Sequence, residues 1–370
     1  MSLNQHQQLY EAIQSSNTPL IAFKQEHNGD VIAASLALAE LLRKMDKKAT
    51  IVSPDFELPH SYQFLAQSNT IQSRLDNLKK LIISLDIIDG QHPEIDYKIE
   101  KNKMHIHVNP TNSNFSKQNI SITDNHYNHD LIITVNTPDL ESLSHVYEKN
   151  TDFFYNVPIV NIDHSPDNEH YGHINIINIA SSSVSEIIYD FIEQTDANLL
   201  DETIATYLLT GMIEKTKSFK TPAITPKSLS IASQLMAAGA QRESIVKNLY
   251  QMQTVGALRL WGRVLLSLKT DDLQKIAWAE VNEQDFRETN ALPQDLVGAI
   301  DELIASVPTI ELTAIFYKKN EQAYCLLKSE KNLDLRVHFA ALEPTGNRTL
   351  IKFPLNTGNE VVLEKLKQLL

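Results

Sequence analysis

Short apolar runs alternate with helical patterns in the first part of the chain. Residues 18–23 (TPLIAF) form a continuous apolar run of strand length, and a polar loop and the helix-forming stretch VIAASLALAELLRKM follow it. Residues 49–53, 131–135 and 159–162 have the same strand-like character. A strand, a loop and a helix in this order form the repeating unit of a parallel α/β sheet. The pattern therefore predicts a parallel α/β domain.

The pattern changes between about residues 89 and 129, where polar and apolar residues alternate. The stretch DYKIEKNKMHIHV is followed by a predicted turn near Asn109 and Pro110 and by a return through NISIT, which predicts an antiparallel β-hairpin inserted in the α/β domain. No acidic or cysteine partner lies at ligand spacing from the histidines of this stretch, so we expect them to be surface residues. They are His92, His105, His107, His126 and His129.

Helical patterns return after residue 181 and continue to about residue 250, with a break near Gly239. Beyond this point ELTAIFYKK, EQAYCLLKS and DLRVHFAAL read as three strands, and residues 361–370 as a final helix. We therefore expect an α/β domain over residues 1–250 and a smaller α+β domain over residues 251–370.

Composition narrows the classes of protein to consider. The 370 residues include 46 acidic and 33 basic side chains, a formal net charge of −13 that disfavours extended nucleic-acid binding. The single cysteine, Cys325, excludes an intrachain disulfide and a cysteine zinc site. No signal-peptide pattern opens the sequence, and no apolar run reaches membrane-spanning length. We expect a cytoplasmic protein with no membrane partner.

Polar side chains are dense directly after the strand predicted at 159–162. Asp163, His164 and Ser165 follow this strand, and Asn168 to His173 form a loop rich in amide, acidic and imidazole groups. Open α/β sheets bind ligands at the carboxyl ends of their strands. The sequence therefore predicts a functional site at this edge of the sheet.

The strand-end loops together resemble the motifs of the DHH phosphoesterase family. The similar stretches are EHNGDVIAASLALAELL, DLIITVNTPDL, VNIDHSPDNEHYGHIN and LLTGMIEKTKSF, in chain order. The likeness is greatest to the branch with short-oligoribonuclease and phosphoadenosine-phosphate phosphatase activity. It implies a DHH-type domain, a DHHA1-like substrate-binding domain, and hydrolysis of phosphate esters or anhydrides with two manganese ions.

Several positions that carry metal ligands in the family hold other residues here. In the first motif Lys24 takes the histidine position and Asn28 that of the first aspartate, whereas Asp30 is retained. Asn136 takes the bridging aspartate position of the second motif, and Lys215 the aspartate position of the fourth. An ammonium group has no lone pair for a metal ion, and a neutral amide cannot bridge two dications as a carboxylate does.

The third motif keeps Asp163 and His164, while Ser165 replaces its last histidine. His27 lies three residues from the ligand position of the first motif. Compared with the family, the chain therefore retains Asp30, Asp163 and His164 as remnants. We expect a catalytically inactive protein without a metal cofactor.

We hypothesise that Lys24 and Lys215 pair with Asp30 and Asp163 and leave a lysine-lined pocket for a nucleotide or short oligonucleotide phosphate. Asn28 and Asn136 would contribute to this pocket in the interdomain cleft. The alternative is that the lysines only neutralise the acids and that nothing binds.

The smaller domain lacks the Gly-Gly-Gly-His loop of the family, because its corresponding stretch contains only the isolated Gly346 and Gly358. Arg336, in DLRVH, is matched to an arginine-bearing strand of the family and is a further candidate phosphate contact. A solvent-facing arginine is the alternative, and Arg348 is a weaker candidate.

Two other functions remain open from the sequence. One is a working phosphodiesterase or oligoribonuclease with a reduced Mn²⁺ site built from His27, Asp30, Asp163 and His164. The other is a subunit that assembles with itself as a homodimer or with an active paralogue.

Overall fold

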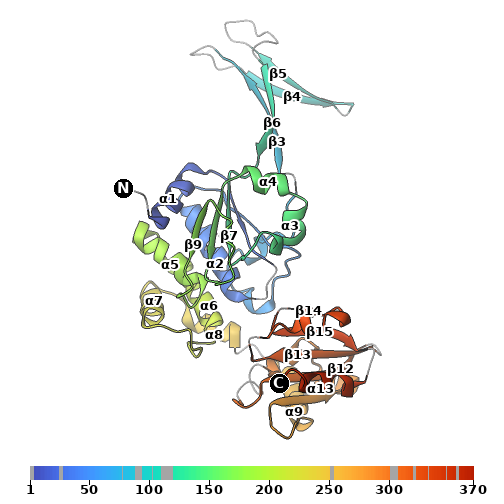
Figure 1. Cartoon of the computed structure of the whole chain (residues 1–370). Helices are drawn as coiled ribbons and strands as arrows, with labels where there is room; N and C mark the ends of the chain where they lie inside the picture. The colour runs from blue at the N-terminus through green and yellow to red at the C-terminus, as the bar shows by residue number, and fades with distance from the viewer. Residues whose placement is uncertain are drawn as a thin grey trace. The chain divides into compact units, whose positions relative to one another are not determined.

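The computed structural model consists of two compact units, Met1–Leu249 and Tyr250–Leu370, each of which is described by itself (Figure 1). The described residues are 4–24, 28–76, 78–87, 94–101, 103–109, 120–250, 254–300, 307–319, 322–331, 333–346, 348–355 and 358–370. Among them, no helix is long and apolar enough to cross a bilayer.

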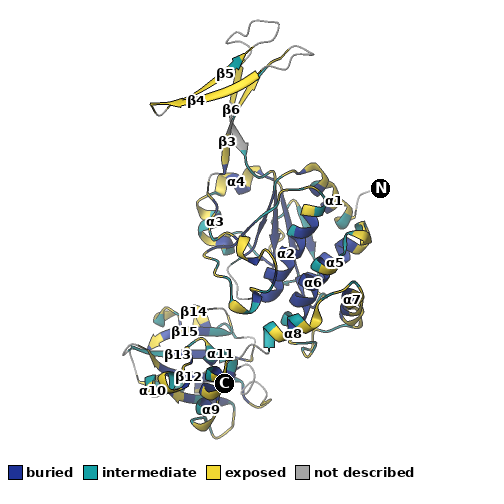
Figure 2. Cartoon of the chain, turned by 180° about the vertical axis from the view of Figure 1, so that it is seen from behind, coloured by how far each residue is buried: buried dark blue, intermediate teal, exposed yellow. Residues whose placement is uncertain are grey.

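A five-stranded parallel sheet forms the centre of the first unit, as the sequence predicts. Its strands are β1 (Pro19–Ala22), β2 (Thr50–Val52), β7 (Leu131–Val135), β8 (Ile159–Asp163) and β9 (Ile174–Ile177), in the spatial order β2-β1-β7-β8-β9. The inner strands β1, β7 and β8 are buried on both faces, which explains their continuous apolar runs (Figure 2).

Helices cover both faces of this sheet. On one side α2 (Gly29–Lys44), α5 (Val184–Thr195) and α6 (Glu202–Lys215) pack against one another, and α2 and α5 contact the sheet. On the other side α3 (Ser144–Glu148) and α4 (Thr151–Asn156) bury Val146, Phe153 and Phe154 against β1, β7 and β8. Because α2 lies between the sheet and α6, it is buried on nearly all sides and lacks a polar face over most of its length.

Three further helices complete the first unit: α1 (Gln5–Ser15), α7 (Pro226–Ala237) and α8 (Arg242–Tyr250). Gly239, with a φ of +98°, lies between α7 and α8 and confirms the predicted break. The Thr225 side chain caps α7, and Pro226 occupies its first position.

The insertion is antiparallel, but its pairing differs from the prediction. Its strands are β3 (Lys79–Leu85), β4 (Glu94–Glu100), β5 (Lys103–Asn109) and β6 (Ile120–Tyr127). The chain reverses between β4 and β5, and residues 120–123 pair with β3, so the predicted pairing of DYKIEKNKMHIHV with NISIT was wrong. Pro110 of the predicted turn lies outside the described residues. The alternation of polar and apolar residues continues with the same period through β4 and β5. It therefore did not indicate the reversal of the chain at Lys101, whose φ is +48°.

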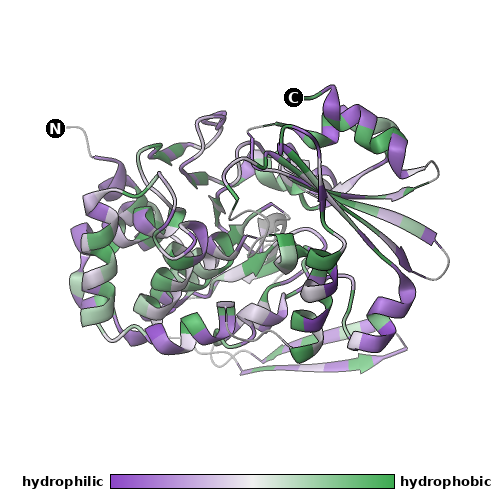
Figure 3. Cartoon of the chain, turned by 90° about the horizontal axis from the view of Figure 1, so that it is seen from below, coloured by the Kyte–Doolittle hydropathy of each residue, from purple (hydrophilic) through white to green (hydrophobic). Residues whose placement is uncertain are grey.

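The second unit has a six-stranded mixed sheet in the order β10-β11-β12-β13-β15-β14, flanked by helices on both faces. Its strands are β10 (Lys269–Thr270), β11 (Ile276–Val281), β12 (Leu312–Lys319), β13 (Gln322–Ser329), β14 (Thr345–Gly346) and β15 (Leu350–Leu355). Its helices are α9 (Val255–Leu266), α10 (Glu283–Thr289), α11 (Asp295–Ala299), α12 (Leu335–His338) and α13 (Asn359–Lys367). Purple and green residues alternate along α13, next to the C label of Figure 3, and its Val362 and Leu366 are buried against the sheet.

The predicted strand DLRVHFAAL was wrong, because these residues form α12 and a following 3₁₀ turn. The Asp334 side chain accepts a hydrogen bond from the Arg336 N–H and caps the helix. Leu335 and Phe339, which are one helical turn apart, are both fully buried. The third long strand is β15 instead.

Gly211 allows the N-termini of α2 and α5 to approach α6 closely. A Cβ atom added at Gly211 would lie 2.1 Å from the Ser185 Oγ and 2.7 Å from the Asp30 Oδ1. Both atoms belong to residues that bond to each other, so neither can move without breaking that contact. The close approach is therefore part of how the strand-end region is held.

We expect Gly211→Ala to lower the free energy of unfolding by about 1–3 kcal/mol, the usual cost of overpacking a buried site. Urea denaturation measures this change. Gly262→Ala in α9 is the matched control, because a Cβ there meets nothing within 4 Å. The control should gain about 0.5–1 kcal/mol from helix propensity. An unchanged or increased stability of Gly211→Ala would contradict the packing argument.

Candidate functional site at the carboxyl ends of the strands

The carboxyl ends of three neighbouring parallel strands bring the predicted site residues to one edge of the sheet. Lys24 follows β1, Asn136 follows β7 and Asp163 ends β8. The Lys24 N–H donates to the Thr137 Oγ1 at 3.2 Å and the Asn136 N–H donates to the Ile162 carbonyl at 2.9 Å, so these ends are tied together. Asn136 has a φ of +48°, a left-handed conformation that asparagine adopts more readily than most residues.

The retained Asp30 carboxylate is 1% exposed and lies against the N-terminus of α5. Its Oδ2 accepts the Val184 N–H at 2.8 Å, and its Oδ1 accepts the Ser185 N–H at 3.2 Å and the Ser185 hydroxyl at 2.6 Å. The first N–H groups of a helix have no partner within the helix and carry a partial positive charge. Both oxygens of Asp30 are therefore engaged in holding α5.

Asn28 caps the helix that carries Asp30. Its side-chain oxygen accepts the Asp30 N–H at 3.0 Å, and its extended backbone is typical of an N-cap residue. The residue at the position of the family's first aspartate thus has a local structural role.

Glu214, which sequence reasoning missed, adds a second acid beside Asp30. The backbone N–H groups of Gly29 and Asp30 donate to its carboxylate, which therefore lies at the N-terminus of α2. Burial, and after it the Asp30 charge, raise the pKa of Glu214 to about 7 against the opposing effects of Lys215 and the two N–H groups. The available signal was an acidic residue on a helix that is otherwise apolar on nearly all sides.

The Asp163 carboxylate is fully buried and also fully used. Its Oδ1 accepts the N–H groups of His164 at 2.6 Å and Ser165 at 3.0 Å, and its Oδ2 accepts the Asn168 side-chain N–H at 2.7 Å. Burial alone would raise the pKa of Asp163, but the hydrogen bonds from His164, Asn168 and the backbone outweigh it and hold the pKa below its usual value. Asp163 is therefore ionised at neutral pH.

The His164 ring lies beside this carboxylate, with its Nδ1 3.6 Å from the Asp163 Oδ1. The Nδ1 atom is buried, and the described residues offer it no partner within hydrogen-bond distance.

Asparagines, rather than ligand groups, account for much of the polar density in the loop after β8. The Asn161 side-chain N–H groups donate to the oxygens of Asn168 at 2.7 Å and Asn175 at 3.2 Å. Asn175 in turn donates to the Gly172 carbonyl at 2.6 Å. The loop is thus held by buried amides, whereas Glu169 and His170 are exposed at its surface.

The donor set does not fit a pair of manganese ions. Asp30 and Asp163 already use their oxygens within the protein, Lys24 and Lys215 are cations, and Asn136 is a neutral amide. Within the described ranges, no group of three or more histidine, cysteine or acidic side chains is placed to hold a metal ion. His27, the remaining candidate ligand, lies outside the described residues.

The described donors to Asp30 and Asp163 are not the lysines that the sequence predicts to pair with them. Backbone groups of α5 and the Asn168 amide supply the described donors to Asp30 and Asp163, and within the described ranges no ion pair joins Lys215 to either. The Lys215 charge acts on Glu214 instead.

Arg336 is not on a strand, and its placement there was wrong. It lies on α12 in the second unit, where its Nε and Nη2 atoms donate to the Asp334 carboxylate at 3.2 and 3.0 Å. The same aspartate caps the helix, so the local sequence rather than a ligand explains the orientation of this arginine.

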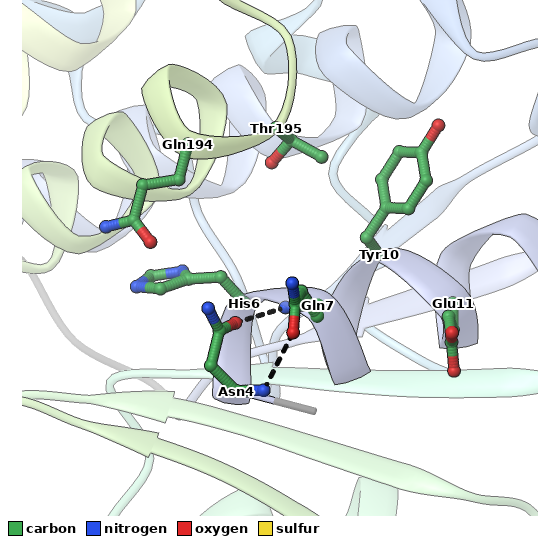
Figure 4. Close-up of a pocket in the computed structure, with 7 residues that line it drawn as sticks. All are labelled: Asn4, His6, Gln7, Tyr10, Glu11, Gln194 and Thr195. Atoms are coloured by element: carbon green, nitrogen blue, oxygen red, sulfur yellow. Dashed lines mark hydrogen bonds between the residues drawn. The ribbon is translucent and has the colours of Figure 1, made fainter. Parts of the chain in front are cut away.

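A separate pocket of about 380 Å³ lies between α1 and α5 (Figure 4). It is lined by Asn4, His6, Gln7, Tyr10, Glu11, Gln194 and Thr195. None of these residues belongs to the motif positions at the strand ends, so the pocket gives no support to the predicted site.

The first unit is thus a parallel α/β domain whose motif loops lie at the carboxyl ends of β1, β7 and β8. The family model for the "DHH family, N-terminal domain" matches residues 20–212. The chain therefore belongs to the DHH family.

The chain is also similar in sequence to curated relatives and in fold to a solved structure. The chain is 26% identical over 224 residues to the bifunctional oligoribonuclease and PAP phosphatase NrnA of Thermus thermophilus, covering 57% of this chain and 64% of that protein. It is 26% identical over 204 residues to the probable enzyme of this name from Streptococcus mutans, covering 55% and 63%. The match thus spans less than two thirds of each relative. An exopolyphosphatase-related protein from Bacteroides fragilis has the same fold, with a TM-score of 0.73, 15% identity and coverage of 98% and 94%.

The position of Glu214 predicts a pH dependence of stability. Its native pKa of about 7 lies above the ordinary value of 4.5, so the native state retains a proton that the unfolded chain loses between these two values. The free energy of unfolding should therefore fall as the pH rises through this window, by at most about 3 kcal/mol. Urea denaturation at pH values on either side of it measures the effect.

Glu214→Gln should remove this component and be more stable than the parent above neutral pH. Glu11→Gln, which alters an exposed acid on α1 of the same unit, should leave the pH profile unchanged. Identical profiles for the parent and Glu214→Gln would show that Glu214 is not held in the arrangement described.

Proposed function

We propose that the chain is a non-catalytic DHH protein that binds a phosphate-bearing nucleotide or short oligonucleotide at the carboxyl ends of β1, β7 and β8. One observation carries this proposal. Positions that hold metal ligands in the family are cationic or neutral here, while both retained carboxylates are engaged within the protein.

The cations are suited to the anion rather than to the metal. Lys24 and Lys215 are both partly exposed, at the end of β1 and at the end of α6. A lysine ammonium binds phosphate as a point charge with three donors. The donors that surround Asp30 and Asp163 compensate these carboxylates locally, which reduces their repulsion of an approaching phosphate.

The substrate class follows from the relatives. The names of the NrnA proteins state oligoribonuclease and PAP phosphatase activity. A chain that keeps the strand-end loops but replaces the metal-ligating residues would still bind the nucleotide and would no longer hydrolyse it. Two neutral side chains would contribute hydrogen bonds to the same site. They are Asn28, at the N-cap of α2, and Asn136, directly after β7.

A second candidate is a hydrolase with a reduced, single Mn²⁺ site. The observation that favours it is the buried His164 Nδ1, which has no partner among the described residues and lies beside the ionised Asp163. His27 and Asp30 would have to complete such a site, and both oxygens of Asp30 would first have to leave α5. This requirement makes it the runner-up.

Calorimetric titration with 3′-phosphoadenosine 5′-phosphate tests the binding proposal. The parent should bind, and Lys215→Ala should weaken binding at least about tenfold, because a charged hydrogen bond contributes about 1.5–3 kcal/mol. Lys220→Ala, at an exposed position five residues further along the chain, is the matched control and should bind as the parent does. Absence of binding by the parent, or equal binding by Lys215→Ala, would reject the proposed site.

Incubation of the same protein with Mn²⁺ and short oligoribonucleotides separates the two candidates. The non-catalytic reading predicts turnover no greater than the buffer blank. Turnover that depends on Mn²⁺ and disappears in His164→Ala would instead establish the reduced hydrolase site.

A further inference from the structure

One face of the two-stranded β4–β5 ribbon is entirely apolar. Successive residues of a strand point to opposite faces, and the register places three apolar cross-strand pairs on the same face. These pairs, called the apolar ribbon face below, are Ile95 with Val108, Tyr97 with Ile106, and Ile99 with Met104.

The apolar ribbon face is open to solvent in the single chain. Its exposed fractions are 68% for Ile95, 68% for Tyr97, 65% for Ile99, 62% for Met104 and 46% for Ile106. Figure 2 shows β4 and β5 almost wholly in the colour of exposed residues. Contiguous apolar surface of this kind marks an interaction site.

The ribbon needs a cover to be stable. β4 and β5 pair only with each other, and within the described ranges no third strand joins their sheet. An isolated two-stranded ribbon is marginal in water and becomes stable when its apolar face packs against another surface. The three apolar pairs on this exposed face therefore indicate that a partner covers it.

The charges of the ribbon exclude an anionic partner surface. Around the apolar face it carries three acidic and three basic residues, so it has no net positive charge. These residues are Glu94, Asp96, Glu100, Lys98, Lys101 and Lys103. Nucleic acid and anionic lipid require an excess of cations, and the whole chain has a net charge of −13. Two balanced ribbons, in contrast, do not repel each other.

The apolar ribbon face is suited to a second copy of itself. The Tyr97–Ile106 pair lies at its centre, and an aliphatic pair lies at each end, so rotation by half a turn brings apolar ends onto apolar ends. The exposed side chains offer on the order of 600 Å² per copy, so a symmetric pair would bury on the order of 1,200 Å², within the range of specific interfaces.

From these observations we infer that the chain forms a homodimer in which two β4–β5 ribbons pack face to face across a two-fold axis. The four strands form a small sandwich with sheets about 10 Å apart. The β3–β6 ladder carries a further exposed apolar pair, Ile83 with Ile122, and a partly buried Leu85 opposite an exposed Ile120. The inference does not depend on nucleotide binding at the strand ends.

Sedimentation velocity of the full chain over a range of concentrations tests the dimer. The parent should sediment as a dimer, and Tyr97→Thr/Ile106→Thr should sediment as a monomer at the same concentrations. The matched control, Lys98→Thr/His105→Thr, alters the cross-strand pair next to it on the opposite face and should remain dimeric. Both double variants introduce one threonine into each strand, and the β-branched threonine favours the strand conformation in both cases.

A cysteine scan guards against the case in which the double variant simply misfolds. Cys325 is the only native cysteine and is fully buried, so an introduced surface cysteine supplies the reactive thiol. Tyr97→Cys should form a disulfide-linked dimer under mild oxidation, whereas Lys98→Cys should not. A monomeric parent at every concentration, or equal cross-linking at the two positions, would overturn the inference.

Discussion

The strand-end region depends on the contact between the Asp30 carboxylate and the N-terminus of α5. This contact joins α2 to α5, and the absence of a side chain at Gly211 of α6 allows the close approach. Glu214 repeats the arrangement one step away, where its carboxylate receives the first N–H groups of α2. Helix N-termini are natural anion sites. Here the protein fills two of them with its own acids.

This constraint shows how the scaffold of the family can be held without the metal ligands that the sequence predicts to be replaced. A buried carboxylate that loses its cation must find other donors, and Asp30 and Asp163 find them in backbone N–H groups and in Asn168. The buried amides of Asn161, Asn168 and Asn175 then hold the loop after β8 without any ion. The framework around these two carboxylates is thus held by groups of the protein itself.

Much of the fold could be predicted from the sequence because its signals are local. Apolar runs marked β1, β7 and β8, and a glycine marked the break between α7 and α8. The failures arose where a local pattern is ambiguous, since the alternation in β4 and β5 hides its turn and the spacing of Leu335 and Phe339 is helical despite a strand-like composition. The motif positions predicted which residues lie at the strand ends, but the partners of Asp30 lie 154 and 155 residues away in the sequence, and no local pattern indicates them.

The most direct test of the account is the binding of Mn²⁺ itself. Equilibrium dialysis of the purified full chain against micromolar Mn²⁺, followed by elemental analysis, counts the ions that each chain retains. Asp30 and Asp163 accept hydrogen bonds within the protein, and the other motif positions hold lysine and asparagine. The account therefore predicts that no dinuclear centre forms and that the chain retains no more Mn²⁺ than a control protein without a metal site. Retention of two ions per chain would contradict it.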